Sequence, residues 1–376
     1  MMVVVQHIAD ALRLAGTMFW QVLWPLLLGF LLSATIETLV PKQAVSRALG
    51  RDSVRGVTLA TLFGAASSSC SYAAVAVART LFRKGASFGN AIIFEFASTN
   101  LVFELGLVLV VLLGWQFLGA ELAGGVIMVV LLALLFRATL RPSLVTAARA
   151  QAERGVQGRM EGHAAMDMSV TDGPLLRRAF SSRALTGVSH YFFMNVYSLW
   201  LDLLLGFLIA GALASWVPSS WWAALFLSGH GVWSDVWDAF IGPLVAMLSF
   251  VCSVGNVPLA ATLWRAGIGF AGAIAFIFGD LVILPILDIY RRYYGVRPAA
   301  YLFVVSFAAM AAAGLAVAAL FHAIGAIPAS HTLAAFGAGV AWDAGTVANI
   351  VLLTVAALLG VRFLRTGGPA MLRLMG

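Results

Sequence analysis

Long runs without a single charged residue constrain this 376-residue chain more than any other feature. They lie at residues 14–36, 56–78, 239–264, 298–342 and 344–361. The hydrocarbon core of a bilayer is about 30 Å thick, so a helix needs about 20 such residues to cross it. Charged residues make up only 10% of the chain, against about 25% in a soluble globular domain. The sequence predicts an all-α, polytopic membrane protein, because the alternating pattern of a membrane β-barrel is absent.

Apolar stretches of spanning length recur along the whole chain. We expect membrane segments at residues 15–39, 57–82, 88–118, 121–138, 190–215, 239–264, 267–290, 299–324 and 343–364. Five tryptophans crowd residues 216–237, which predicts an interfacial helix. We divide the chain into a first membrane repeat (1–138), a cytoplasmic loop (139–189), a second membrane repeat (190–325) and a C-terminal membrane helix with its tail (326–376).

One stretch of the sequence occurs twice. Residues 70–102 align without a gap on residues 252–284, at an offset of 182, and thirteen positions are identical. The identities include Cys70 with Cys252, Ser71 with Ser253, Thr80 with Thr262, Arg83 with Arg265 and Gly85 with Gly267. Apolar composition alone does not bring Cys, Arg and Gly into register, so we expect two homologous halves.

The basic residues predict how these halves are oriented. If every segment crosses the membrane, the 23 Lys and Arg divide into 13 on the side of the long loop and 10 on the other. If segments 57–82 and 239–264 enter and return to the same face, only Arg13 and Arg265 fall on the far side. The positive-inside rule favours this second arrangement. It predicts two inverted repeats, each with a re-entrant or broken helix that carries a Cys-Ser motif.

Polar and small residues surround the centres of these two segments. Each limb of about 12 residues rises about 18 Å as a helix, so its tip lies just past the middle of the bilayer core. Broken helices of this kind form binding sites near the midplane of transporters. The candidate site residues at the tips are Ser69, Cys70, Ser71, Cys252, Ser253 and Asn256.

Further candidates lie just downstream of the repeated motif, well inside their membrane segments. They are Glu95, Asn100 and Asp280. Charges in the bilayer core are costly, so such residues mark substrate or proton pathways, although helix packing is the alternative role. We expect the two carboxylates, one in each half, to bind and release protons during transport. Carboxylates near segment ends are expected instead to reach the interface or pair with Arg. These are Glu37, Asp288 and Asp343.

The cysteine pair admits two interpretations. As small apolar residues retained from one ancestral unit, Cys70 and Cys252 only pack the core. As soft ligands near the midplane, they bind a thiophilic species such as trivalent arsenic or Cu(I). Two sulfur atoms fall short of a tetrahedral structural zinc site.

Other classes of function find little support. No nucleotide-binding, G-x-S-x-G, H-E-x-x-H or C-x-x-C pattern stands in a suitable context, so we expect neither a catalytic site nor a cofactor. The net charge of +7 comes from Arg between apolar segments, which fits membrane topology better than nucleic-acid binding. Met160, His163, Met166 and Met168 in the long loop would suit copper, but ordinary linker composition is the simpler interpretation.

Several motifs together resemble a known family. They are SSSCSYAAVAVARTLFRKGASFGNAIIFEFASTNLVFELG, SFVCSVGNVPLAATLWRAG, FGDLVILPILDIYRRYYG and the terminal RFLRTGGPAMLRLMG. Over nearly the whole chain, the sequence resembles the bacterial predicted-permease family that includes the ArsP-like organoarsenical permeases. The resemblance implies a multi-spanning permease of the bacterial inner membrane. Its distinguishing elements are the two Cys-containing motifs and the acidic positions after them.

These observations predict a secondary permease that moves a small solute without ATP. A thiophilic arsenical or metal species is the sharper hypothesis for the solute, with protons as the coupling ion. We expect the loop 139–188 and the C-terminus to face the cytoplasm. The bilayer and a small molecule or ion are the expected partners, and nucleic acid is not. Two alternatives stay open: a membrane-embedded enzyme acting on a lipid or thiol, and a metal-sensing membrane scaffold.

Overall fold

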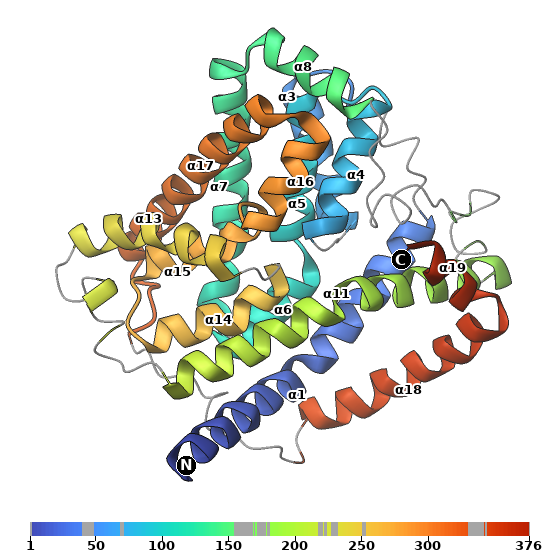
Figure 1. The fold of residues 1–376 in the computed structure, drawn as a ribbon, viewed down its shortest axis with the longest axis vertical. Coiled ribbons are helices and arrows are strands. Elements are labelled where there is room, and N and C mark those ends of the chain that lie inside the picture. The colour runs from blue at the N-terminus through green and yellow to red at the C-terminus, as the bar shows by residue number, and fades with distance from the viewer. Residues whose placement is uncertain are drawn as a thin grey trace.

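The computed structural model is helical in the residues that it describes (Figure 1). Those residues are 2–39, 49–67, 71–153, 168, 170, 178, 181–216, 221, 224–226, 232–249, 253–329, 342 and 344–375. The first half contains α1 (Met2–Leu39), α3 (Val54–Ser67), α4 (Ser71–Arg83), α5 (Phe88–Asn100), α6 (Phe103–Leu112), α7 (Trp115–Thr139) and α8 (Pro142–Ala152). The second contains α11 (Ser182–Trp216), α13 (Val232–Ser249), α14 (Ser253–Arg265), α15 (Phe270–Ile277), η1 (Phe278–Leu281), α16 (Leu284–Tyr294), α17 (Val296–Ala323), α18 (Ala344–Arg365) and α19 (Gly368–Met375).

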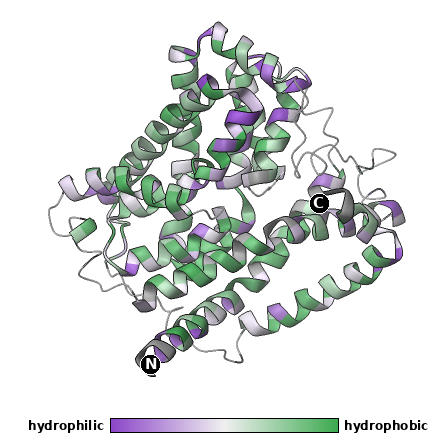
Figure 2. Cartoon of the chain, viewed as in Figure 1, coloured by the Kyte–Doolittle hydropathy of each residue, from purple (hydrophilic) through white to green (hydrophobic). Residues whose placement is uncertain are grey.

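Several described helices are long and apolar enough to cross a membrane. Five pass by length and composition: Gln6–Leu39, Phe88–Leu112, Trp115–Thr139, Val296–Ala323 and Ala344–Arg365. A sixth candidate is the pair Phe270–Leu281 and Leu284–Tyr294, which is bent by 41°. Hydrophobic residues line the long helices α11 and α17, whereas hydrophilic residues gather around α8 and α16 (Figure 2). The predicted all-α, polytopic membrane class is therefore confirmed.

The duplicated motif builds the same local structure twice. α4 and α14 have identical bounds at the offset of 182, and α5 and α15 begin 182 residues apart. Gly85 and Gly267 follow the first pair with φ of 108° and 101°, a left-handed conformation that favours glycine. The next amides donate to Leu81 O and Leu263 O at 3.0 and 3.1 Å. The repeat in sequence is thus a repeat in these turns.

The helix pairs α3–α5 and α13–α15 pack closely at equivalent positions. A Cβ added to Gly64 of α3 would lie 2.9 Å from the Ala97 Cβ of α5. In the second half glycine and alanine exchange places: the alanine is Ala246 of α13, and the glycine is Gly279 of η1. A Cβ on Gly279 would collide with the Ala246 Cβ. One glycine at each crossing lets the two backbones approach, as small residues do between membrane helices.

The C-terminal ends of α4 and α14 lie at different ends of α7. α8, which follows the end of α7, contacts the end of α4, because Arg149 Nη1 donates to Phe82 O at 3.1 Å. Near the start of α7, the Phe117 ring lies 5.1 Å from that of Trp264 in α14. α7 has 25 residues and is therefore about 37 Å long. Figure 1 accordingly draws α4 and α14 on different levels of the molecule.

Three predicted segment boundaries need correction. The window 88–118 is divided, because the helices end after Leu112 and Gly114, with φ of 98°, precedes α7. The loop 139–188 contains α8, which begins at Pro142, a residue favoured in the first turn, and buries Ala148 and Ala152. α11 begins at Ser182, within the same predicted loop. Half of the predicted interfacial helix 216–237 lies outside the described residues.

The most deeply buried helices are short ones in the centre. Every residue of α5, α15 and η1 is buried, as are residues 253–264 of α14. α18 lies at the other extreme, with only Thr346, Asn349 and Phe363 buried. Polar side chains carried by the central helices are consequently held away from water.

Candidate functional site

Asp280 is the best-connected buried carboxylate. It lies in η1, where α15 tightens into a 3₁₀ turn before the chain bends into α16 at Leu284–Pro285. The Ser71 hydroxyl, at the start of α4, donates to Asp280 Oδ2 at 2.7 Å. Thr99 and Asn100, at the end of α5, also lie within interaction range of this carboxylate. Residues predicted from separate parts of the sequence therefore meet here, with Asp280 from the second half and the others from the first.

Glu95 makes a second connection between the halves. It lies in the middle of α5, is fully buried, and accepts a hydrogen bond at Oε1 from the Tyr290 hydroxyl of α16. The Tyr290 ring stacks on Tyr294, with 6.2 Å between centroids. Glu95 also lies within electrostatic range of Asp280. The two predicted carboxylates are thus neighbours, although they have different hydrogen-bonding partners.

Glu121 of α7 joins these carboxylates without having been predicted. Its side chain is 1% exposed, and neither carboxylate oxygen has a hydrogen-bond partner among the described residues. It lies within electrostatic range of Asp280. A signal was available in the sequence, because Glu121 stands inside an apolar helix that begins at Trp115. Because the predicted segment 121–138 begins at Glu121, the prediction treats this carboxylate as one at a segment end.

The second half contributes Ser253 and Asn256 from the first turn of α14. Both are buried, and Asn256 Oδ1 accepts from the Ser249 hydroxyl of α13 at 3.1 Å. No described residue makes a hydrogen bond to Asn256 Nδ2. Ser98, which is equivalent to Asp280 in the repeat, makes only a local bond to Glu95 O at 2.8 Å. The three remaining candidates, Ser69, Cys70 and Cys252, lie outside the described residues.

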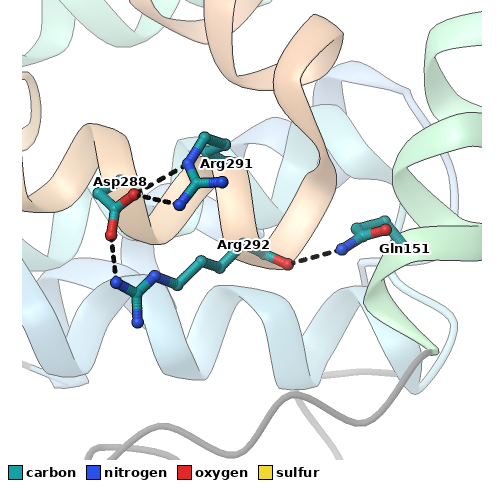
Figure 3. A network of polar contacts seen from close by, with 4 residues as sticks. All are labelled: Gln151, Asp288, Arg291 and Arg292. Carbon is teal, nitrogen blue, oxygen red and sulfur yellow. Dashed lines mark hydrogen bonds and ion pairs between the residues drawn. The ribbon is translucent and has the colours of Figure 1, made fainter.

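The carboxylates near segment ends behave differently. Asp288 of α16 is exposed and accepts from Arg291 at 2.9 and 2.7 Å, while Arg292 pairs with its other oxygen at 2.6 Å (Figure 3). Gln151 of α8 donates to the Arg292 carbonyl at 3.1 Å. The predicted pairing of Asp288 with Arg is confirmed. Asp343 lies outside the described residues.

The central arrangement is built from side-chain oxygen atoms. Within the described part of the chain, no group of three or more His, Cys, Asp or Glu is placed to hold a metal ion. What is present is a set of oxygen atoms, from Glu95, Asp280 and Glu121 together with Asn100 and the Ser71 hydroxyl. An ionised carboxylate is costly in such surroundings, so each of the three carboxylates changes its interactions greatly when it gains or loses a proton.

Comparison with known proteins gives the family. The family model described as "Predicted permease" matches residues 7–319. "Putative permease Rv2963" of Mycobacterium tuberculosis is 51% identical over 338 residues, which cover 90% of this chain and 83% of that protein. "UPF0718 protein YraQ" of Escherichia coli is 28% identical over 272 residues, covering 70% and 68% respectively. No solved structure matches the chain significantly. The chain belongs to the predicted permease family, and the family supports a membrane transporter.

Proposed function

We propose that the protein is a secondary transporter in which protons on Asp280, Glu95 and Glu121 drive the movement of a small solute. The observation that carries the proposal is the bond from Ser71 to Asp280, which joins the two halves at a fully buried carboxylate. A rearrangement of the halves would break this bond. Protonation of Asp280 changes its strength, because a charged acceptor makes a stronger hydrogen bond than a neutral one.

The transporter has two inverted halves in this proposal. In the first half, the start of α3 and the end of α4 converge, since Leu49 O accepts from Ser87 N at 3.0 Å. In the second half, the start of α13 and the end of α14 converge similarly, since Asp238 Oδ2 accepts from Gly269 N at 2.6 Å. Each pair of helices thus returns to the end where it began. The contacts of α4 and α14 with different ends of α7 support opposite orientations.

The solute class rests on sequence alone. A trivalent arsenical or a thiophilic metal species is the first class to test, because Cys70 and Cys252 occupy matching positions in the repeats. Cys→Ser changes keep the size of the side chain but remove the soft donor. If the thiols are ligands, either change abolishes binding of methylarsenite. If they only pack the core, transport is unchanged.

Localisation follows from the same topology. The protein would lie in the bacterial inner membrane as a multi-pass protein, with the loop 139–188 and the C-terminus in the cytoplasm. The basic residues that flank the described helices on the side of α8 support this orientation. They include Arg51, Arg55, Arg83, Arg137 and Arg141.

Reconstituted flux tests the proposal. Purified protein in proteoliposomes would be offered methylarsenite, copper, mercury and small organic thiols, with and without an imposed pH gradient. We expect a substrate-dependent proton flux that Asp280→Asn abolishes and Asp288→Asn preserves, because Asp288 is an exposed, Arg-paired carboxylate on the same chain segment. Equal proton coupling in wild type and Asp280→Asn would contradict the role of Asp280. Solute flux that does not depend on the pH gradient would contradict proton coupling.

A further inference from the structure

A groove of about 690 Å³ opens between α3, α5, α7 and α8, and none of the three central carboxylates lines it. Its apolar wall includes Val57 of α3, Ile93 of α5, and Val130 and Leu134 of α7. Val130 and Leu134 are 49% and 56% exposed. They belong to a candidate membrane span, and such an exposed apolar wall suits acyl chains.

The polar end of the groove is basic. Arg137, in the last turn of α7, lines the groove, is exposed, and makes no hydrogen bond or ion pair with the described residues. Arg51, Arg55 and Arg141 are also exposed and stand within a few residues of the lining in the chain. Asp52 is the one acidic residue in the lining, and its carboxylate accepts a hydrogen bond from the Ser87 hydroxyl. The surplus of guanidinium groups favours an anion.

A buried acceptor also lines this groove. Asn90 is 1% exposed, and its Nδ2 donates to Leu49 O and Arg51 O at 3.0 and 2.8 Å. Its Oδ1 has no hydrogen-bond partner in the part of the chain that the structure describes. A buried acceptor without a donor is costly, so this atom favours a ligand that carries a hydroxyl or amine.

We propose that the groove binds one anionic glycerophospholipid with a hydroxylated headgroup, of the phosphatidylglycerol type. The phosphate lies at Arg137 and an acyl chain lies along Val57, Ile93, Val130 and Leu134. The headgroup hydroxyls face Asn90 and Asp52. Basic pockets between membrane helices at a membrane surface bind anionic headgroups in this way.

Lipid titration of the full-length protein in detergent, followed by native mass spectrometry, tests the site. We expect phosphatidylglycerol to bind more tightly than phosphatidylcholine. Arg137→Gln should weaken phosphatidylglycerol binding about fivefold, because one Arg contributes about 1 kcal/mol of attraction to anionic lipid. The matched control is Arg365→Gln, since Arg365 is an exposed residue at the end of another candidate span and does not line the groove.

A second variant separates the acyl-chain contact from the charge. Ala133→Phe fills the groove and leaves Arg137 in place, so it should weaken phosphatidylglycerol binding while Ala357→Phe on α18 does not. Melting temperatures report whether each variant folds. Wild-type binding by Arg137→Gln or Ala133→Phe would overturn the proposal. Equal affinity for phosphatidylcholine, tighter binding of phosphatidylethanolamine, or full competition by glycerol phosphate alone would also overturn it.

Discussion

The buried carboxylates differ in the number of groups that stabilise them. Asp280 has a hydroxyl donor in Ser71, and Glu95 has one in Tyr290, whereas Glu121 has none among the residues that the structure describes. A carboxylate without donors is strongly disfavoured in its charged form. Glu121 therefore has the least reason to be present for stability, and a functional role explains its position in α7 better than a packing role.

The first prediction concerns Glu121. Glu121→Gln keeps the size of the side chain but cannot exchange a proton, so we expect proton flux to fall to background while the melting temperature stays within a few degrees. The control is Glu153→Gln at the exposed end of α8, which should leave both quantities unchanged. Flux and melting are measured in proteoliposomes and detergent respectively. Normal proton flux through Glu121→Gln would show that the residue only packs.

The second prediction concerns the bond between Tyr290 and Glu95. Tyr290→Phe removes the donor and leaves a buried carboxylate oxygen without a partner, which costs about 1–3 kcal/mol. We expect a lower melting temperature in detergent. Tyr301→Phe is the matched control, because the Tyr301 hydroxyl shares a 2.9 Å hydrogen bond with Thr139 in an exposed position where water replaces it. If both variants melt alike, the buried bond contributes nothing to stability.

Part of this site was accessible from the sequence. The cost of polar groups in a bilayer singled out Glu95, Asn100 and Asp280, and the repeat singled out Ser71. Tyr290 gave no such signal, because a tyrosine near Arg291 and Arg292 is typical of a membrane interface. Which donor meets which carboxylate depends on how α4, α5 and α16 pack together, and that packing is not encoded in any local pattern.

At the scale of elements, short helices with close crossings set the architecture. A Cβ on Gly242 of α13 would collide with Gly272 O of α15, which is backbone and cannot rotate away. Uncharged windows locate such helices but do not give their breaks. Single residues set these breaks. Gly114 divides an apolar stretch, and Pro142 starts α8 at the beginning of a polar one.

The third prediction tests such a crossing. Gly242→Ala should separate α13 from α15 and lower stability by about 1–3 kcal/mol, the usual cost of overpacking. Gly16→Ala in α1 is the control, because nothing lies within 4 Å of a Cβ at that position and Ala favours a helix by up to about 1 kcal/mol. Melting in detergent measures both. Equal or higher stability of Gly242→Ala would mean that the two helices are not in close contact.

At the scale of the whole molecule, the offset of 182 residues links sequence and fold. Equivalent turns after α4 and α14, and equivalent crossings in the two halves, follow from it. The orientation of each half across the membrane is a separate property, which the basic residues predict through the positive-inside rule. Charge counts describe an average bias, so the position of each loop needs a direct measurement.

The fourth prediction concerns this orientation. In a background with Cys70→Ser and Cys252→Ser, single cysteines at Arg55, Arg83 and Arg265 would be labelled in intact cells by a membrane-impermeant maleimide. In the proposed topology α3 and α4 return to the face where they began, so Arg55→Cys and Arg83→Cys should both be protected and react only after permeabilisation. The proposed inversion has the α13–α14 pair open to the opposite face, so Arg265→Cys should react from outside. Labelling of Arg55→Cys and Arg83→Cys from different sides would contradict the hairpin. Labelling of Arg83→Cys and Arg265→Cys from the same side would contradict the inversion, since both residues end equivalent helices in the two halves.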